Sequence, residues 1–378
     1  MRLASCLLFL LFPASLFAQQ STPGVPAAPP IAAKAYLLLD FHSRQTLVAY
    51  NPHERVEPAS LTKLMTAYLT FAALRQKLIQ REQRVVVSER AWRAEGSRTF
   101  IEPRKPVTVD ELMRGMIVQS GNDASIALAE AVAGSEEVFA QMMNREAQRL
   151  GMKNTHFVNS TGLPHPQHYS SAYDLALLAS ALIHDFPEYY PLYAEKEFRY
   201  NNISQSNRNR LLWTDPAVDG MKTGYTEHSG YSLISSAKRG PRRLISVVLG
   251  AASESVRAGE SQKLLNYGFQ FYDSVRLYEK NQPVVTLQVW KGSGNNVKAG
   301  FLHDLHLALP RGYAERLKAS VESRQPLLAP ISAGQRIAVL KLALDGKPYA
   351  EYPLVALEAV SLAGILGRGW DTLRLLFK

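Results

Sequence analysis

The stretch SLTKLMTAYLTFAALRQKL, residues 60–78, carries both a long helical pattern and a pair of side chains suited to chemistry. Its apolar residues recur at helical spacing, which predicts a helix from Ser60 to about Leu78. Ser60 and Lys63 are three positions apart, so both lie on one face, one turn from each other. A helix N-terminus favours developing negative charge, and a lysine whose pKa is lowered can take a serine's proton. Alone, the pair is equally typical of an N-cap serine and a surface lysine.

A second pattern, Ser120-Gly121-Asn122, follows an apolar helical segment that ends at Gln119. Ser120 could relay a proton between Lys63 and a leaving group, and Asn122 offers an amide for binding a substrate. The same three residues also suit a glycine C-cap followed by an asparagine N-cap. By itself this pattern does not decide between chemistry and structure.

A third pattern, DGMKTGYT at residues 219–226, comes just before a predicted strand. Lys222 supplies a fixed positive charge, and Thr223 and Thr226 supply hydroxyl groups. Gly224 would let an extended substrate approach the strand edge closely. A glycine-rich turn leading into an edge strand is the alternative interpretation.

In this order and at these separations, the three patterns resemble the Ser-x-x-Lys, Ser-x-Asn and Lys-Thr-Gly triplets of penicillin-binding proteins and serine β-lactamases. Further segments are similar to the low-molecular-mass D-alanyl-D-alanine carboxypeptidases in particular. These segments are residues 58–66, 159–163, 170–174, 207–209 and 309–312. The resemblance spans almost the whole chain after residue 18.

The resemblance implies a two-step acyl transfer on the stem pentapeptide of peptidoglycan, with β-lactam antibiotics as inhibitors and no cofactor. Ser60 would attack the carbonyl of the penultimate D-alanine, the terminal D-alanine would leave, and water would hydrolyse the acyl-enzyme. Lys63 would be the general base for acylation. Ser120 and Lys222 would guide the proton to the leaving amine.

The same resemblance assigns the residues that bind the substrate. Asn122 would hold the substrate amide, and the backbone N–H groups of Ser60 and Tyr225 would form the oxyanion hole. Some family members carry histidine at the position of Tyr225, so only its backbone role is carried over. Lys222, Thr223 and Thr226, around Gly224, are candidates for binding the terminal carboxylate. A fourth candidate is Arg257, which resembles the family's carboxylate-binding arginine.

The composition narrows the partners and excludes several classes of site. Lys and Arg number 43 against 33 Asp and Glu, and the resulting net charge of +10 suits an anionic lipid or an acidic polymer. The lone cysteine, Cys6, excludes a disulfide framework and a cysteine-rich zinc site, and the nine histidines are scattered, so no metal site is expected. An exported chain is not expected to bind nucleic acid. The oligomeric state stays open.

The order of strands, many helices, further strands and a last helix, from Ser261 to Phe271, predicts an α+β fold. It would combine a β-lactamase/transpeptidase-like domain, with helices against an antiparallel sheet, and a small all-β domain. The apolar run from Leu7 to Phe17 before Ala18 has the layout of a secretory signal peptide. The predicted divisions are a signal peptide at 1–18, a proline-rich linker at 19–34, the catalytic domain at 35–274, the β-domain at 275–357 and an amphipathic helix at 358–378.

The predicted C-terminal helix has its apolar residues on one arc and its charged residues on the other side. Its four charges argue against crossing a bilayer, so a helix lying on an anionic membrane surface is favoured, with Trp370 at the headgroup level. A helix packed on the β-domain is the alternative. The predicted location is the periplasmic side of a bacterial inner membrane, as a peripheral protein.

Three other functions share features of this sequence. A serine β-lactamase needs a glutamate that activates a deacylating water, and neither Glu188 nor Glu195 lies in a segment that resembles that loop. A D,D-endopeptidase would use nearly the same site on cross-linked peptides. A non-catalytic wall-binding scaffold is disfavoured because a decayed site usually loses at least one of five triplet residues, and all five are present. These residues are Ser60, Lys63, Ser120, Asn122 and Lys222.

Overall fold

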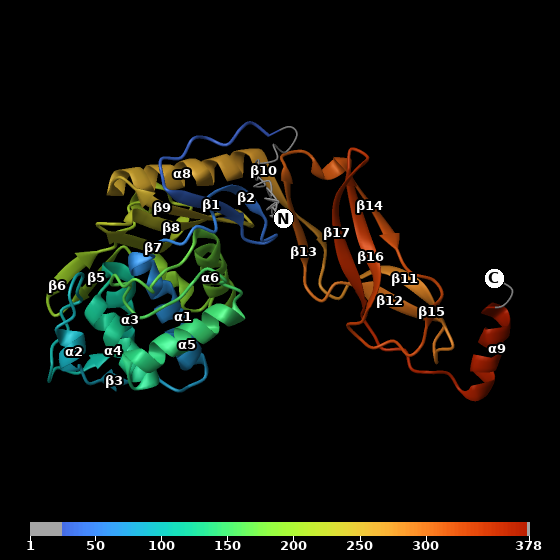
Figure 1. The fold of residues 1–378 in the computed structure, drawn as a ribbon, viewed down its shortest axis with the longest axis horizontal. Helices are drawn as coiled ribbons and strands as arrows, with labels where there is room; N and C mark the ends of the chain where they lie inside the picture. The colour runs from blue at the N-terminus through green and yellow to red at the C-terminus, as the bar shows by residue number, and fades with distance from the viewer. Residues whose placement is uncertain (1–24, 376–378) are drawn as a thin grey trace, which may run out of the picture.

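The computed structural model describes residues 25–375, which form a larger domain with a central sheet and a smaller β-domain (Figure 1). The predicted signal peptide, the first part of the predicted linker and residues 376–378 lie outside the described residues. The described part of the linker packs on the larger domain. Val25 and Ile31 contact its core, and the Tyr267 hydroxyl donates to the carbonyl of Pro26 at 2.8 Å. Residues 25–34 are therefore packed rather than free.

The larger domain is built on a five-stranded antiparallel sheet in the order β2-β1-β9-β8-β7. Successive residues of a strand point to opposite faces, so Leu37 and Leu39 enter one core while Leu38 enters the other. The strands are β1 (Ala35–Asp40), β2 (Thr46–Tyr50), β7 (Val218–Thr226), β8 (Gly230–Arg239) and β9 (Arg242–Ala251). β7 forms one edge of the sheet.

Helices cover both faces of this sheet (Figure 1). α8 (Glu254–Phe271) packs on one face, and α6 (Ala172–Asp185) packs on the other, against a layer of further helices. The other helices of this domain are α1 (Lys63–Arg75), α2 (Glu89–Trp92), α3 (Val109–Arg114), α4 (Asn122–Ala133), α5 (Glu136–Arg149) and α7 (Leu211–Thr214). Shorter elements are the 3-10 turns η1 (Ala59–Thr62) and η3 (Tyr190–Ala194), the π turn η2 (Gly115–Gln119), and two hairpins, β3 (Arg84–Val85) with β4 (Val107–Thr108) and β5 (Glu197–Tyr200) with β6 (Ile203–Ser206).

This architecture confirms the predicted α+β fold class, but three elements differ from their prediction. The helix predicted from Ser60 starts as the 3-10 turn η1, and α1 begins only at Lys63. α8 begins at Glu254 rather than near Ser261, because the Ser253 side chain caps it by accepting from the N–H of Val256. Residues 218–226 are themselves the edge strand β7 rather than a turn before a strand.

The β-domain follows α8 without a loop, because β10 (Tyr272–Tyr278) begins at the residue after α8 ends. β10 pairs with β13 (Leu305–Pro310), and a six-stranded sheet in the order β14-β16-β17-β12-β11-β15 lies over a separate core. At the junction of the two domains, the rings of His42 and His306 stack with centroids 5.1 Å apart. The other elements are β11 (Pro283–Trp290), β12 (Asn296–Gly300), η4 (Ala314–Arg316), β14 (Leu317–Glu322), β15 (Leu327–Leu328), β16 (Arg336–Leu344) and β17 (Lys347–Ala356).

The C-terminal segment differs from the prediction of one helix starting at residue 358. Val360 is buried in the core of the β-domain and pairs with Ile331, because this stretch extends the sheet packing. The helix itself, α9 (Ile365–Leu375), lies beside the β-domain at the end of the molecule far from the five-stranded sheet (Figure 1). Between residues 25 and 375, no helix combines the length and the apolar character needed to cross a bilayer.

Candidate active site

A cavity of about 320 Å³ opens where η1, the start of α4 and the edge strand β7 meet. Eight of the ten residues predicted for the site line this cavity. They are Ser60, Ser120, Asn122, Thr223, Gly224, Tyr225, Thr226 and Arg257. The other two, Lys63 and Lys222, are buried and hydrogen-bonded to lining side chains. The fold therefore brings together residues that are far apart in the sequence.

Ser60 and Lys63 contact each other, as their spacing predicts. Lys63 Nζ donates to Ser60 Oγ at 3.0 Å. It also donates to Asn122 Oδ1 and to the backbone carbonyl of Thr161, both at 2.6 Å. These three acceptors match the three N–H groups of a charged lysine.

The surroundings of Lys63 disfavour its charged form. The residue is 1% exposed, and burial together with the charge of Arg208 lowers its pKa to about 7. The carboxylates of Asp123 and Glu136 act in the opposite direction and raise the pKa. An amine with a pKa near 7 is partly neutral at neutral pH and can accept a proton.

Ser120 is presented to the cavity by an irregular backbone. It follows the π turn η2 and adopts a left-handed conformation with φ 68°. Such turns and such conformations at non-glycine residues are concentrated at functional sites. Ser120 Oγ accepts from Lys222 Nζ at 2.9 Å, and burial, followed by the charge of Lys63, places the pKa of Lys222 well below its ordinary value.

Asn122 is held at both ends of its amide group. Its Oδ1 accepts from Lys63, and its Nδ2 donates to the carbonyl of Glu95 at 2.6 Å. The next residue, Asp123, accepts the backbone N–H groups of residues 99–101, which fixes the loop above the amide. A primary amide has two N–H groups and two lone pairs, so Asn122 keeps one of each for a ligand.

Two glycines allow a close approach to the turn that carries Ser60. A Cβ at Gly162, where φ is +86°, would lie 1.8 Å from the carbonyl oxygen of Ala59. A Cβ at Gly224 would lie 3.1 Å from the carbonyl oxygen of Pro58. Gly224 thus accommodates η1, and it also lines the cavity, where its predicted closeness to a substrate stays a prediction.

The predicted carboxylate binders differ in the donors that they can offer. Thr226 Oγ donates to Glu57 at 2.8 Å, so its proton is already in use. Arg257 lies on α8, is 3% exposed and lines the cavity, where its Nη1 donates to the carbonyl of Gly224 at 3.3 Å. Arg257 is therefore not a surface arginine. Thr223 also lines the cavity and is buried.

Three residues of the site were missed in the sequence. Thr161 contributes only its backbone carbonyl, which no side-chain pattern can indicate. Arg208 lines the cavity between Asn207 and Asn209, whose amides anchor this loop to the carbonyls of residues 195 and 220. The asparagine pair was a usable signal, since it fixes the residue between. Glu254, at the start of α8, gave no signal.

The carboxylates considered for a β-lactamase lie elsewhere. Glu188 pairs with Arg75 at 2.9 Å, and Glu195 pairs with Arg114 at 2.5 Å. Neither lines the cavity. Of the described residues that do line it, Glu254 alone carries a carboxylate, and it pairs with Arg257 at 3.4 Å.

The geometry agrees with comparisons against known proteins. Residues 22–253 match the family model of D-alanyl-D-alanine carboxypeptidases, and residues 272–361 match the C-terminal domain of penicillin-binding protein 5. The chain belongs to the D-alanyl-D-alanine carboxypeptidase family. The family predicted from the three triplets is thus confirmed.

Similar proteins cover nearly the whole chain. D-alanyl-D-alanine carboxypeptidase DacC of Escherichia coli is 43% identical over 99% of this chain and 94% of its own. Penicillin-binding protein 5 of Haemophilus influenzae superimposes with a TM-score of 0.87 at 41% identity, over 89% of this chain and 99% of its own. Penicillin-binding protein D2 of Listeria monocytogenes, solved with ampicillin bound, has a TM-score of 0.60 at 29% identity, over 65% of this chain and all of its own.

Proposed function

We propose that this chain is a serine-type D-alanyl-D-alanine carboxypeptidase that removes the terminal D-alanine from peptidoglycan stem pentapeptides. The observation that carries the proposal is the buried Lys63, whose pKa is about 7 and whose Nζ lies 3.0 Å from Ser60 Oγ. Family membership supplies the substrate class.

Lys63 acts as the general base because its other contacts orient its lone pair. A neutral lysine has two N–H groups, and the carbonyl of Thr161 and Oδ1 of Asn122 accept both at 2.6 Å. The lone pair then faces Ser60 Oγ. Ser60 transfers its proton to Lys63 as its oxygen bonds to the substrate carbonyl carbon.

The second half of acylation breaks the bond to the terminal D-alanine. The proton that Lys63 took from Ser60 passes through Ser120 and Lys222, joined at 2.9 Å, to the leaving amine nitrogen. The backbone N–H groups of Ser60 and Tyr225 bind the oxyanion, a contribution of about 2.7–4 kcal/mol per donor in other serine enzymes. Water then attacks the ester carbonyl, and Ser60 Oγ leaves as the hydroxyl.

The terminal carboxylate of the substrate binds where Arg257 and Thr223 line the cavity. Arg257 and the Thr223 hydroxyl are its partners, with Lys222 adding positive charge. Thr226 acts indirectly, since its proton is donated to Glu57. We assign no direct hydrogen bond from Thr226 to the carboxylate.

The chain is proposed to act at the periplasmic face of the inner membrane. The predicted signal peptide would export it, and α9 would rest on anionic lipid. Ile365, Trp370 and Leu373 of α9 are 79%, 65% and 54% exposed, an unusual exposure for large apolar side chains, and Arg374 lies near them on the same helix.

The test is a time course of intact mass after mixing the protein with benzylpenicillin, beside D-alanine release from a stem pentapeptide. A penicilloyl adduct that persists for minutes on the wild type and is absent in Ser60→Ala, together with D-alanine release, is the expected result. Rapid return to the free mass with hydrolysed drug would instead identify a β-lactamase. Cleavage of cross-linked dimers to monomers without D-alanine release would identify an endopeptidase, and no adduct and no cleavage would identify a scaffold.

A further inference from the structure

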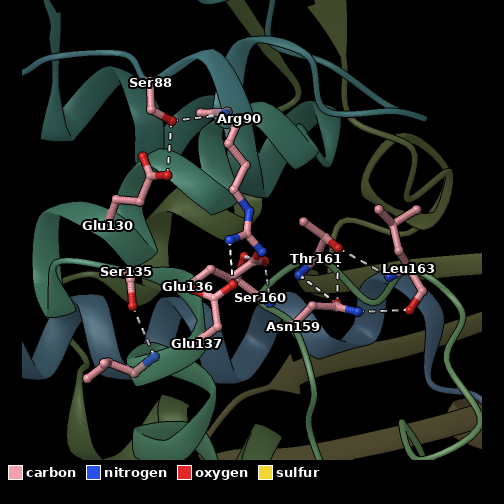
Figure 2. A network of polar contacts seen from close by, with 12 residues as sticks. Ser88, Arg90, Glu130, Ser135, Glu136, Glu137, Asn159, Ser160, Thr161 and Leu163 are labelled. Atoms are coloured by element: carbon pink, nitrogen blue, oxygen red, sulfur yellow. Dashed lines mark hydrogen bonds and ion pairs between the residues drawn. The ribbon is translucent and has the colours of Figure 1, made fainter.

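A network of polar side chains lies behind the active site, outside the three triplets (Figure 2). Its centre is Glu136, at the start of α5, whose side chain is 5% exposed. Glu136 Oε1 accepts from the backbone N–H of Ser160 at 2.9 Å and from the Ser160 hydroxyl at 2.6 Å. Glu136 Oε2 accepts from Arg90 at 2.6 Å. A buried carboxylate is costly unless it is satisfied in this way.

The contacts of Glu136 bear on the loop that supplies a ligand of Lys63. Ser160 is followed by Thr161, whose carbonyl accepts from Lys63 Nζ at 2.6 Å. The Ser160 carbonyl accepts from Thr66 Oγ on α1 at 2.7 Å, and Asn159 Oδ1 accepts from the N–H of Gly162 at 2.7 Å. Figure 2 shows this loop facing Glu136. Asn144 of α5 holds the preceding Phe157, and Glu136 is the side chain of α5 that bonds Ser160 in the loop itself.

We propose that Glu136 is a positioning residue of the active site: its buried carboxylate anchors Ser160, so that the adjacent Thr161 carbonyl stays aligned with Lys63 Nζ. This proposal deepens the proposed function, because it concerns the base of the same reaction. Glu136 touches neither the substrate nor the reacting atoms. Its negative charge has a second effect: it raises the pKa of Lys63 and so opposes the lowering that burial causes.

Glu136 is one of several charged or titratable groups that surround Lys63 from different elements. Asp123 raises the pKa of Lys63, as Glu136 does, whereas Arg208 lowers it. Lys222 and His168 also interact electrostatically with Lys63, and burial is the main reason that the pKa of each is lowered. Asp123 cannot replace Glu136 as an anchor, because its oxygens accept the backbone N–H groups of residues 99–101 and 124.

The neighbouring Glu137 offers a matched control. It also accepts from Arg90, at 2.5 Å, but its side chain is 64% exposed and no contact joins it to Ser160. Glu136→Gln and Glu137→Gln therefore each remove one negative charge that pairs with Arg90, at adjacent positions. Only the first changes the anchor of the loop.

The experiment measures the second-order rate of Ser60 acylation by benzylpenicillin in the full chain between pH 5 and 9. For Glu136→Gln, we expect the plateau rate to fall roughly 10- to 100-fold, because misplacing a reacting group by about 1 Å costs up to 100-fold. We also expect the midpoint of the acid limb to move to lower pH, because a charge that raises the pKa of Lys63 is gone. Glu137→Gln should keep both the plateau and the midpoint of the wild type.

Three results would overturn the proposal. The first is a pH–rate profile of Glu136→Gln that equals that of the wild type. The second is an equal fall of the plateau rate in both variants. The third is a lower plateau rate in Glu136→Gln with no shift in the midpoint of its acid limb. If Glu136→Gln fails to fold, Glu136→Asp is tested instead, because it keeps the charge but has a shorter side chain. Its plateau rate of acylation should fall, while the midpoint of its acid limb should stay that of the wild type. An unchanged plateau rate in Glu136→Asp refutes the anchor. Failure of the proposed function itself is distinguishable, because the wild type and Glu137→Gln would then form no adduct.

Discussion

Replacing Gly162 by alanine tests how closely the loop presses on the turn that carries Ser60. The added Cβ would lie 1.8 Å from the carbonyl oxygen of Ala59, whereas real Cβ contacts stay beyond 3.0 Å. The turn or the loop must therefore move by more than about 1 Å, and such a displacement of reacting groups costs about 100-fold in rate. Movement of the turn displaces Ser60, and movement of the loop displaces the Thr161 carbonyl from Lys63, so either response slows acylation.

Gly151→Ala is the matched control, because Gly151 has φ +79° but no atom within 4 Å of the added Cβ. Both variants carry the strain of a left-handed alanine, about 1–2 kcal/mol, so both should lose some stability in a urea titration. Only Gly162→Ala should lose about 100-fold in the second-order rate of acylation by benzylpenicillin. The reasoning is refuted if Gly162→Ala acylates within threefold of the wild type, or if Gly151→Ala slows by the same factor.

Three further predictions follow from other contacts. Acylation of the wild type should fall about tenfold per pH unit below pH 7, because Lys63 must be neutral to act as a base and protonates there; a rate that is flat from pH 5 to 8 would contradict this role. His168→Ala should lower the free energy of unfolding in a urea titration by about 1–3 kcal/mol, because the buried His168 forms a hydrogen bond of 2.8 Å with the Thr62 hydroxyl. His165 is exposed, so His165→Ala should change this free energy little. A chain that ends at Gly364 should stop floating with phosphatidylglycerol vesicles and melt only slightly earlier than the full chain, because it loses the contacts of Asp371 with Lys291 and of Arg374 with Trp290. One that ends at residue 359 should melt clearly earlier, because it also loses Val360 from the core; continued vesicle binding without α9 would refute the anchor.

The sequence predicted the fold class and the family because both depend on patterns that are local. Apolar periodicity indicated most helices and strands, and the three triplets are short enough to recognise around Ser60, Asn122 and Lys222. The start of α8 was missed because its first residues, ESVRAG, show little apolar periodicity and the signal is the cap at Ser253. The end of the β-domain was misplaced because Val360 gains its core position from an isolated β-bridge to the distant Ile331.

The parts of the site that could not be predicted depend on contacts between distant segments. The Thr161 carbonyl and the Glu136 carboxylate meet Lys63 and Ser160 only through packing of α1, α5 and the loop at 159–163. The contact of Gly224 with η1 was missed for the same reason, since nothing in residues 219–226 indicates that η1 lies against them. Backbone acceptors and close approaches carry no side-chain pattern of their own.

The pairing of β1 with β9 has a consequence for how the enzyme is made. Ala35 lies opposite Leu249, so the sheet cannot close until nearly the whole domain has been synthesised. Such long-range closure slows folding and leaves the edges of the sheet open in the meantime. The link between Lys222 and Ser120 forms only once β7 has joined this sheet. Covalent labelling by penicillin should therefore appear only in fully folded chains, which makes the antibiotic a kinetic probe for the last step of folding.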